Sequence, residues 1–228
     1  MTKPALKICC VKSLEEALLA LNAGADLIGL VSEMPNGPGV ISLAEISEII
    51  RALPAETKTV LLTSKTTANE IVAQQKQTLA WGVQVVGHIS FGGVSKRRTL
   101  LPEVTIIRVV HVADAATVDI ASSYFETVDY LLLDSGSPLA KPKSLGGTGH
   151  VHDWNISRQI CELSPVPVLL AGGIHVGNLL DACAEVTPSG IDLCSGLRTN
   201  DSLDPDKVAA FISVLDQLDD NSQPGVRE

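Results

Sequence analysis

The chain has 228 residues, of which 45% are hydrophobic, 19% charged and 3% aromatic, so it can bury an ordinary core and is not intrinsically disordered. With so few aromatic residues the core has to be aliphatic, which favours parallel strands packed against helices over an aromatic-rich sandwich. The formal net charge of −9 argues against a nucleic-acid partner, because binding nucleic acid requires a surplus of Lys and Arg on one face.

The start of the chain and its cysteines indicate a cytoplasmic protein. Residues 1–8 lack the apolar segment and cleavage site of a signal peptide, and no apolar run approaches the roughly 20 residues that span a bilayer. The five cysteines show neither C-x-x-C nor Cys/His zinc spacing. We therefore expect free thiols in the cytoplasm, no metal and no membrane partner.

Short apolar runs of strand length alternate with helical periodicity along the chain. Apolar residues three and four apart predict helices over residues 14–21 and 43–50. Ser13 and Ser42 each precede a Glu by three residues, the pattern of a capping box, and Gly24 predicts the end of the first helix. The eight apolar runs cover residues 6–9, 27–31, 59–62, 83–86, 105–112, 130–133, 166–171 and 191–194.

Eight strands of continuous hydrophobicity, each followed by a helical or loop segment, predict an α/β chain folded as a closed (βα)₈ or TIM barrel. The fourth unit is the weakest, because residues 88–101 contain paired glycines and three adjacent basic residues in place of a clear helix. On the pattern alone, an open sheet of fewer strands stays possible. We expect one domain over residues 1–218 and a polar tail over residues 219–228.

In such barrels the working residues lie at the C-terminal ends of the strands. The seventh predicted strand ends in Gly172-Gly173 and the eighth in Ser195-Gly196. Loops after these two strands commonly hold phosphate, because glycine lets backbone N–H groups approach an anion. We predict a phosphate site here, with tight turns as the structural alternative. Gly147 lies in a third glycine-rich segment, which is either a loop that closes over a ligand or a linker.

Cys9 and Asp134 end the first and sixth predicted strands, and Lys7 lies close behind Cys9. A thiolate near positive charge can act as a base, and a buried carboxyl with a raised pKa can act as an acid. An acid and a base at one end of a barrel suit an isomerase. Each residue also has a structural interpretation, since buried cysteines are usually inert and an Asp at a strand end often caps a helix.

The other cysteines and the histidines are predicted to be structural. Free cysteines are usually buried, so we expect Cys10, Cys161, Cys183 and Cys194 to fill the core. The histidines do not form a metal-binding pair on one helix.

A series of short motifs follows the predicted strands from one end of the chain to the other. They are Lys7-Ile8-Cys9, Gly24-Ala25-Asp26-Leu27-Ile28-Gly29, Gln84, Leu132-Leu133-Asp134-Ser135, Gly146-Gly147-Thr148-Gly149 with Asp153-Trp154, Leu170-Ala171-Gly172-Gly173-Ile174 and Gly190-Ile191-Asp192-Leu193-Cys194-Ser195-Gly196. In this order, and over nearly the whole chain, they resemble the phosphoribosylanthranilate isomerase family of tryptophan biosynthesis.

The resemblance implies a (βα)₈ barrel that converts N-(5-phosphoribosyl)anthranilate into a 1-deoxyribulose 5-phosphate product by an Amadori rearrangement, without metal or organic cofactor. Asp134 would protonate the ring oxygen of the ribose, and Cys9 would remove the proton from C2′. The phosphorylated substrate would be bound by Lys7 and by residues of the glycine turns, namely Gly147, Gly172, Gly173, Ser195 and Gly196. We expect a monomer or a homodimer.

Three positions depart from the family pattern. Gly39 stands where the family has an arginine that contacts the anthranilate carboxylate, Cys10 replaces a glycine, and Leu197-Arg198 replaces a hydrophobic residue and a glutamate. Arg108 and Arg198 are therefore our candidate partners for that carboxylate. Because of Gly39, two alternatives stay open: an isomerase or epimerase of another phosphosugar amine, and a non-catalytic protein that binds a phosphoribosyl ligand.

Overall fold

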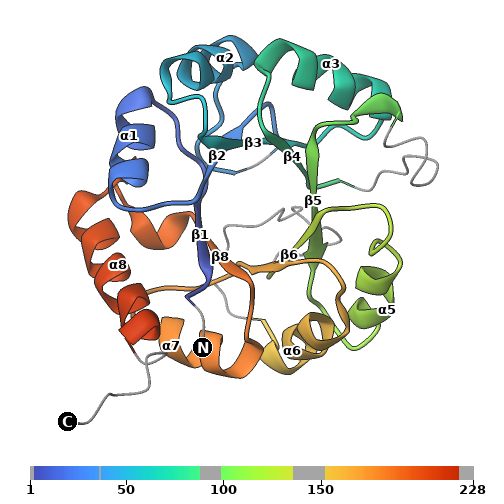
Figure 1. Ribbon diagram of the computed structural model, residues 1–228, viewed down its shortest axis with the longest axis vertical. Helices are drawn as coiled ribbons and strands as arrows, with labels where there is room; N and C mark the ends of the chain where they lie inside the picture. The colour runs from blue at the N-terminus through green and yellow to red at the C-terminus, as the bar shows by residue number, and fades with distance from the viewer. Residues whose placement is uncertain (1–2, 36, 88–98, 136–151, 221–228) are drawn as a thin grey trace.

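In the computed structural model the chain forms a closed barrel of eight parallel strands, which confirms the predicted (βα)₈ fold (Figure 1). The structure describes residues 3–35, 37–87, 99–135 and 152–220. Each strand pairs with the next in sequence, and β8 closes the ring on β1. The strands are β1 (Ala5–Ile8), β2 (Leu27–Val31), β3 (Lys58–Thr63), β4 (Gly82–Val85), β5 (Thr105–His111), β6 (Tyr130–Asp134), β7 (Val168–Leu170) and β8 (Gly190–Leu193).

The helices form a ring around the strands (Figure 1). Between β8 and the last helix lie a short 3₁₀ turn, η1 (Ser195–Leu197), and a small antiparallel pair, β9 (Arg198–Thr199) and β10 (Ser202–Leu203). The irregular segment expected after the fourth strand falls largely on residues 88–98, outside the described residues. The helices are α1 (Leu14–Asn22), α2 (Leu43–Ala52), α3 (Ala68–Thr78), α5 (Thr117–Ser122), α6 (Trp154–Leu163), α7 (Leu179–Val186) and α8 (Pro205–Asp220).

The two predicted helix starts differ in how their caps are built. At α2 the capping box is complete: Glu45 N–H donates to Ser42 Oγ at 3.2 Å, and Ser42 N–H donates to Glu45 Oε2 at 2.8 Å. At α1 Ser13 Oγ accepts from Glu16 N–H at 3.1 Å, but the Glu16 carboxylate is directed elsewhere. The expectation of a reciprocal box at Ser13 was therefore wrong, because Glu16 binds Arg198 instead.

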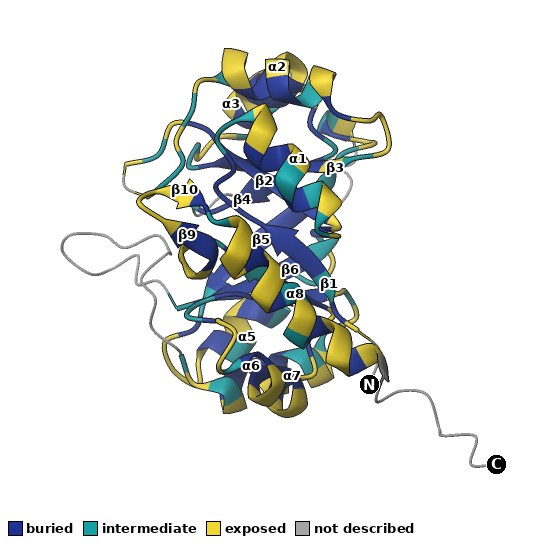
Figure 2. Cartoon of the chain, turned by 90° about the vertical axis from the view of Figure 1, so that its left-hand side faces the viewer, coloured by how far each residue is buried: buried dark blue, intermediate teal, exposed yellow. Residues whose placement is uncertain are grey.

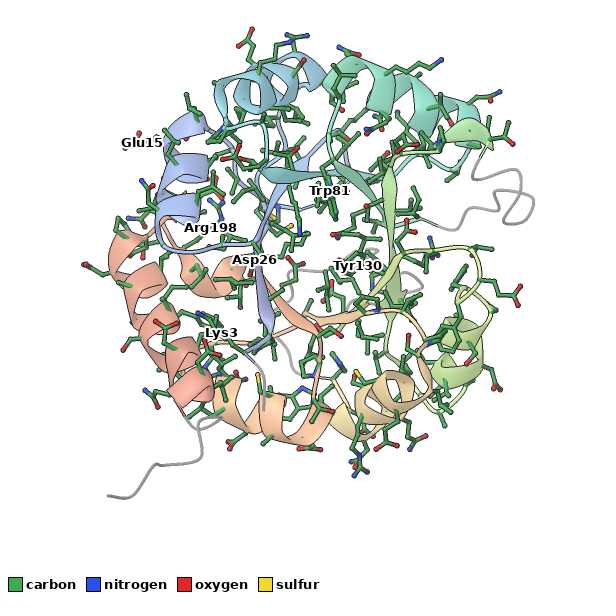
Figure 3. The ribbon with its side chains drawn as sticks, in the orientation of Figure 1. Lys3, Glu15, Asp26, Trp81, Tyr130 and Arg198 are labelled. Atoms are coloured by element: carbon green, nitrogen blue, oxygen red, sulfur yellow. The ribbon has the colours of Figure 1, made fainter. Side chains whose placement is uncertain are left out.

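The interior of the barrel is a small aliphatic core. Trp81, directly before β4, and Tyr130, the first residue of β6, meet edge to face with ring centroids 6.5 Å apart (Figure 3). Both lie at N-terminal strand ends, so they close the base of the barrel and leave its opposite end open. The buried aliphatic side chains above them are Leu27, Val31, Val60, Leu62, Val86, Ile107, Val109, Leu132, Leu169 and Ala171.

A second, larger core lies between the strands and the ring of helices. Because side chains alternate along a strand, Ile106 and Val110 of β5 belong to this outer layer, whereas Ile107 and Val109 belong to the interior. Figure 2 shows the strands of the barrel mostly buried and the helices exposed on their outer faces. The strands are thus covered on both sides, as their continuous hydrophobicity predicts.

The described residues form a single barrel together with the helices and short strands attached to it. Helix α8 continues to Asp220, so Asp219 and Asp220 are helical although the composition assigned them to a tail, and residues 221–228 lie outside the described residues. Within the described ranges, none of the helices is both long and apolar enough to cross a membrane.

Candidate active site

A pocket opens at the C-terminal end of the barrel. Cys9 lies at its floor directly after β1, and Asp134 enters from the end of β6. The glycine turns after β7 and β8 form one side, and the loop between β2 and α2 forms another with Met34 and Pro38. The other lining residues are Cys10, Val31, Gly37, Leu62, Gln84, Val86, Val109, Leu132, Ala171, Gly172, Gly173, Ile174, Asp192, Leu193, Cys194, Ser195 and Gly196.

The environment of Cys9 is set by a buried ion pair beneath it. Lys7 is fully buried, and its ammonium donates to Asp192 Oδ1 at 2.8 Å. Burial opposes the charge of Lys7, but the attraction of Asp192 and the neighbouring thiols outweighs it and raises the pKa of the ammonium. A Cβ built on Gly29 would lie 3.0 Å from Cys9 Sγ and 3.2 Å from Lys7 Nζ, so the cation and the thiol lie close together.

Asp134 has the properties expected of an acid. Its side chain is buried, and Ser135 N–H donates to Oδ1 at 2.7 Å. Burial, together with the negative charge of Asp192, raises its pKa to about 6, although the Ser135 N–H and Lys7 act in the opposite direction. A carboxyl with this pKa keeps an appreciable protonated fraction near neutral pH, where an ordinary Asp is fully ionised.

The turns predicted to hold phosphate face the pocket beside Asp134. Gly172 has a φ of +77°, and a Cβ at this position would lie 2.8 Å from Ser135 N, so glycine alone allows the turn to pack against the end of β6. No hydrogen bond joins the N–H groups of Gly172, Gly173, Ser195 or Gly196 to another residue of the described chain. These donors are therefore available to an anion. Gly147 lies outside the described residues.

Comparison with known proteins identifies this barrel. The family model described as N-(5'phosphoribosyl)anthranilate (PRA) isomerase matches residues 6–214. The chain belongs to this family. It is 34% identical over 209 residues to N-(5'-phosphoribosyl)anthranilate isomerase 2 of Methanosarcina mazei, covering 91% of this chain and 92% of that one. It is 33% identical over 224 residues to the isomerase of Gloeothece citriformis, covering 98% and 99%.

Solved PRA isomerase structures share the fold over almost their whole length. The enzyme of Thermotoga maritima superposes with a TM-score of 0.78 at 25% identity, covering 94% of this chain and 99% of that one. The enzyme of Thermococcus kodakaraensis gives a TM-score of 0.75 at 27% identity, covering 93% and 98%. The chain is thus an isomerase of tryptophan biosynthesis, as the resemblance implied.

Neither arginine that we considered for the anthranilate carboxylate of a PRA isomerase reaches the pocket. Arg108 points outward from β5, donates to Gly87 O and lies 4.7 Å from the ring centroid of Tyr124. Arg198 lies beside α1 (Figure 3) and donates to Glu16 Oε2 at 3.0 Å. Lys7, which we placed in the substrate-binding set, is sealed beneath the pocket by its ion pair. The described lining therefore contains no cation.

Four residues of this PRA isomerase pocket were not assigned to it from sequence alone. Cys10 and Cys194 were expected to be inert core, yet both line the pocket. Asp192 and Gln84 were quoted only as parts of motifs, and Gln84 Oε1 is buried without a hydrogen-bond partner among the described residues. For Asp192 and Gln84, the sequence did offer a signal: each is a polar residue in the middle of an apolar strand, and a buried polar residue has to be either paired or functional.

Proposed function

We propose that this isomerase rearranges N-(5'-phosphoribosyl)anthranilate with Asp134 as the general acid and Cys9 as the general base. The observation that carries the proposal is a carboxyl with a pKa of about 6 in the same pocket as a thiol that lies over a buried ammonium. The two groups enter from β6 and β1, which are separated by β7 and β8 in the closed barrel, so a sugar bound between them can contact both groups.

In the first step the protonated Asp134 gives its proton to the ring oxygen of the ribose, the bond between C1′ and that oxygen breaks, and a Schiff base forms. In the second step the Cys9 thiolate removes the proton from C2′, and the electron pair moves toward the nitrogen to give an enolamine. The enolamine then tautomerises to the amino-ketose. No electrons leave or enter the substrate, and each group acts on one proton at a time.

The phosphate end of the substrate fits the turns after β7 and β8. Four N–H groups without partners in the described chain, from Gly172, Gly173, Ser195 and Gly196, support this assignment, because among the described lining residues there is no cation that would compete with them for the phosphate. The aromatic end then falls against Met34 and Pro38 of the loop between β2 and α2. These side chains offer an apolar surface to a ring.

We also propose that the protein acts in the cytoplasm, as a monomer or a homodimer, without a nucleic-acid partner. The enzyme of Thermotoga maritima is described as dimeric, which supports the homodimer as one of the two states. The acidic composition supports the absence of a nucleic-acid partner.

An assay of the turnover of N-(5'-phosphoribosyl)anthranilate, monitored as the loss of the substrate's fluorescence, tests the assignment. We expect Asp134→Asn and Cys9→Ser each to lower kcat by about 10²- to 10⁴-fold, the usual contribution of a positioned acid or base. Both variants should still bind the reduced product analogue, 1-(o-carboxyphenylamino)-1-deoxyribulose 5-phosphate, which a solved PRA isomerase structure contains. Cys161→Ser, on α6 outside the pocket, is the matched control and should keep full turnover. Full turnover by Cys9→Ser would refute the role of Cys9.

A further inference from the structure

Three cysteines line the pocket, and only one of them has a part in the proposed reaction. Ile8 of β1 stands opposite Leu193 of β8, and Cys9 N–H donates to Leu193 O at 2.7 Å. The residues that follow, Cys9 and Cys194, therefore leave the two neighbouring strands side by side. Cys10 lies next to both and belongs to the same buried cluster.

The backbone turns sharply at Cys10, which lines the same pocket as Cys194 of the segment after β8. Its φ of +62° is in the left-handed region, which non-glycine residues rarely adopt. Two neighbours hold this conformation: Arg198 Nη2 donates to Cys10 O, and Gly39 packs so closely that a Cβ there would lie 2.8 Å from Cys10 Cβ. In this position Cys10 lines the same pocket as Cys9 and Cys194, and both of these thiols act on its pKa.

The two neighbouring thiols differ in acidity and in access. The hydrogen bond from Cys10 lowers the pKa of Cys194, and the Arg198 charge acts in the same direction against the effect of burial. The hydrogen bonds to Cys194 and Cys9, together with burial, raise the pKa of Cys10. Cys194 is also partly exposed, whereas Cys10 is buried. An acidic, accessible thiol beside a protonated one is the usual arrangement of a redox-sensitive cysteine and its resolving partner.

A metal site does not explain the cluster, because no group of three or more His, Cys, Asp or Glu side chains in the described ranges is arranged to hold an ion. Simple core filling does not explain it either. A left-handed cysteine held by a buried arginine is a strained arrangement, and strain of this kind collects at functional sites.

We propose that Cys10 and Cys194 form a reversible disulfide in the pocket when the protein meets hydrogen peroxide, and that this disulfide lowers the activity of the protein. The Cys194 thiolate attacks one peroxide oxygen, the O–O bond breaks, and hydroxide leaves to become water, which makes Cys194 a sulfenic acid. The Cys10 sulfur then attacks Cys194, the S–O bond breaks, and the Cys10 proton leaves with the hydroxyl group as a second water. Two thiols lose two electrons, and one peroxide is reduced to two waters.

The bridge would join the ends of β1 and β8 across the floor of the pocket. It would fix Cys10 beside the proposed base, Cys9, and alter the turn that begins at Ser195, which the proposed function assigns to phosphate. The effect on activity rests on that proposed function, whereas formation of the bridge does not. In a reducing cytoplasm such a disulfide is transient and regulatory.

The test uses the full chain treated with a small excess of hydrogen peroxide, then alkylated and digested without reductant for mass spectrometry. Cleavage before Asp residues leaves Cys194 on the fragment 192–200, apart from Cys161 and Cys183. We expect this fragment linked to the N-terminal peptide, with loss of two of the five alkylatable thiols. The oxidised protein should lose turnover by about 100-fold, the scale of a displaced catalytic group, and dithiothreitol should restore it.

Variants are needed to assign the bridge, because Cys9 and Cys10 lie on the same N-terminal fragment, residues 1–25. The cross-link should persist in Cys9→Ala, Cys161→Ser and Cys183→Ser, and disappear in Cys10→Gly and Cys194→Ser. A cross-link lost in Cys9→Ala, or only sulfinic acids without any cross-link, overturns the proposal. So does a complete cross-link with unchanged turnover. If the reduced protein has no turnover, the proposed function fails, and the mass spectrum still decides whether the bridge forms.

Discussion

At the scale of single residues, Asp134 connects the chemistry of the pocket to the stability of the barrel. Its pKa is about 6 in the folded chain against an ordinary value of 3.8, mainly because burial disfavours the carboxylate. Well below pH 3.8 the group is neutral in both the folded and the unfolded chain, so it has no effect on stability. Between pH 3.8 and pH 6 the unfolded chain ionises while the folded chain stays protonated, so the free energy of unfolding falls as the pH rises, and it levels off above pH 6.

Replacing Asp134 by Asn should remove this pH dependence. We expect Asp134→Asn to exceed the parent protein in free energy of unfolding by about 2–3 kcal/mol at pH 8, and to match it near pH 3, from the size of the pKa shift. Urea denaturation at both pH values measures the difference. Asp181→Asn, on the exposed side of α7, is the control and should leave the pH dependence unchanged. An equal pH dependence in the parent and in Asp134→Asn would contradict the burial of a protonated carboxyl.

Gly39 is the second residue to consider at this scale, and its role is steric. The resemblance led us to expect it where the family has an arginine, and its φ of +71° together with its contact on Cys10 explains why glycine is required here. A Cβ would lie 2.8 Å from Cys10 Cβ and 2.9 Å from Cys10 C. The residues at positions 39 and 10, which we expected to depart from the family pattern, are thus in contact with each other.

We expect Gly39→Ala to lower the free energy of unfolding by about 2–4 kcal/mol, combining left-handed backbone strain with overpacking. Gly87→Ala is the matched control, because its nearest neighbour would be 3.5 Å away and its φ is not positive, and it should change stability by about 1 kcal/mol or less. Thermal or urea unfolding checks both variants. Equal stability of Gly39→Ala and the parent would show that the loop can move away from Cys10.

At the scale of elements, one buried ion pair ties α1 to the segment after β8. Glu16 accepts from Arg198 Nη1 at 3.1 Å and Nη2 at 3.0 Å, and also from the Leu203 N–H of β10 at 2.9 Å. Burial opposes ionisation of Glu16, but these donors outweigh it and lower its pKa. The stabilisation is therefore present above the pKa of the unfolded chain and is lost as the pH falls through the lower folded value.

Glu16→Gln should destabilise the fold by about 2–4 kcal/mol, because it leaves the Arg198 charge buried with an incomplete set of partners. Glu15→Gln, one residue earlier on the exposed face of α1, is the matched control and should change stability by about 0.5 kcal/mol or less. Urea denaturation at pH 7 compares the two. A loss in Glu16→Gln no larger than that in Glu15→Gln would mean that the pair does not hold α1 to β10.

At the scale of the whole molecule, the barrel was predictable because continuous hydrophobicity marks strands that are covered on both sides. Parallel topology then brings Cys9 and Asp134 to one rim, since all strand C-termini meet there. The direction of Arg108 was not predictable, because the residues on both faces of β5 are apolar and nothing in the sequence says which face is inside. The Lys7–Asp192 pair depends on closure of β8 against β1, a contact 185 residues apart.

The pH dependence of kcat/KM for N-(5'-phosphoribosyl)anthranilate tests the central claim most directly, because this ratio reports the ionisations of the free enzyme. With Asp134 as an acid whose pKa is about 6, the slope of log(kcat/KM) against pH should decrease by one near pH 6 in the parent protein, and this break should be absent from Asp134→Asn, while affinity for the reduced product analogue changes little. A parent profile without a break near pH 6, or the same break in Asp134→Asn, would contradict Asp134 as the acid that opens the ribose ring.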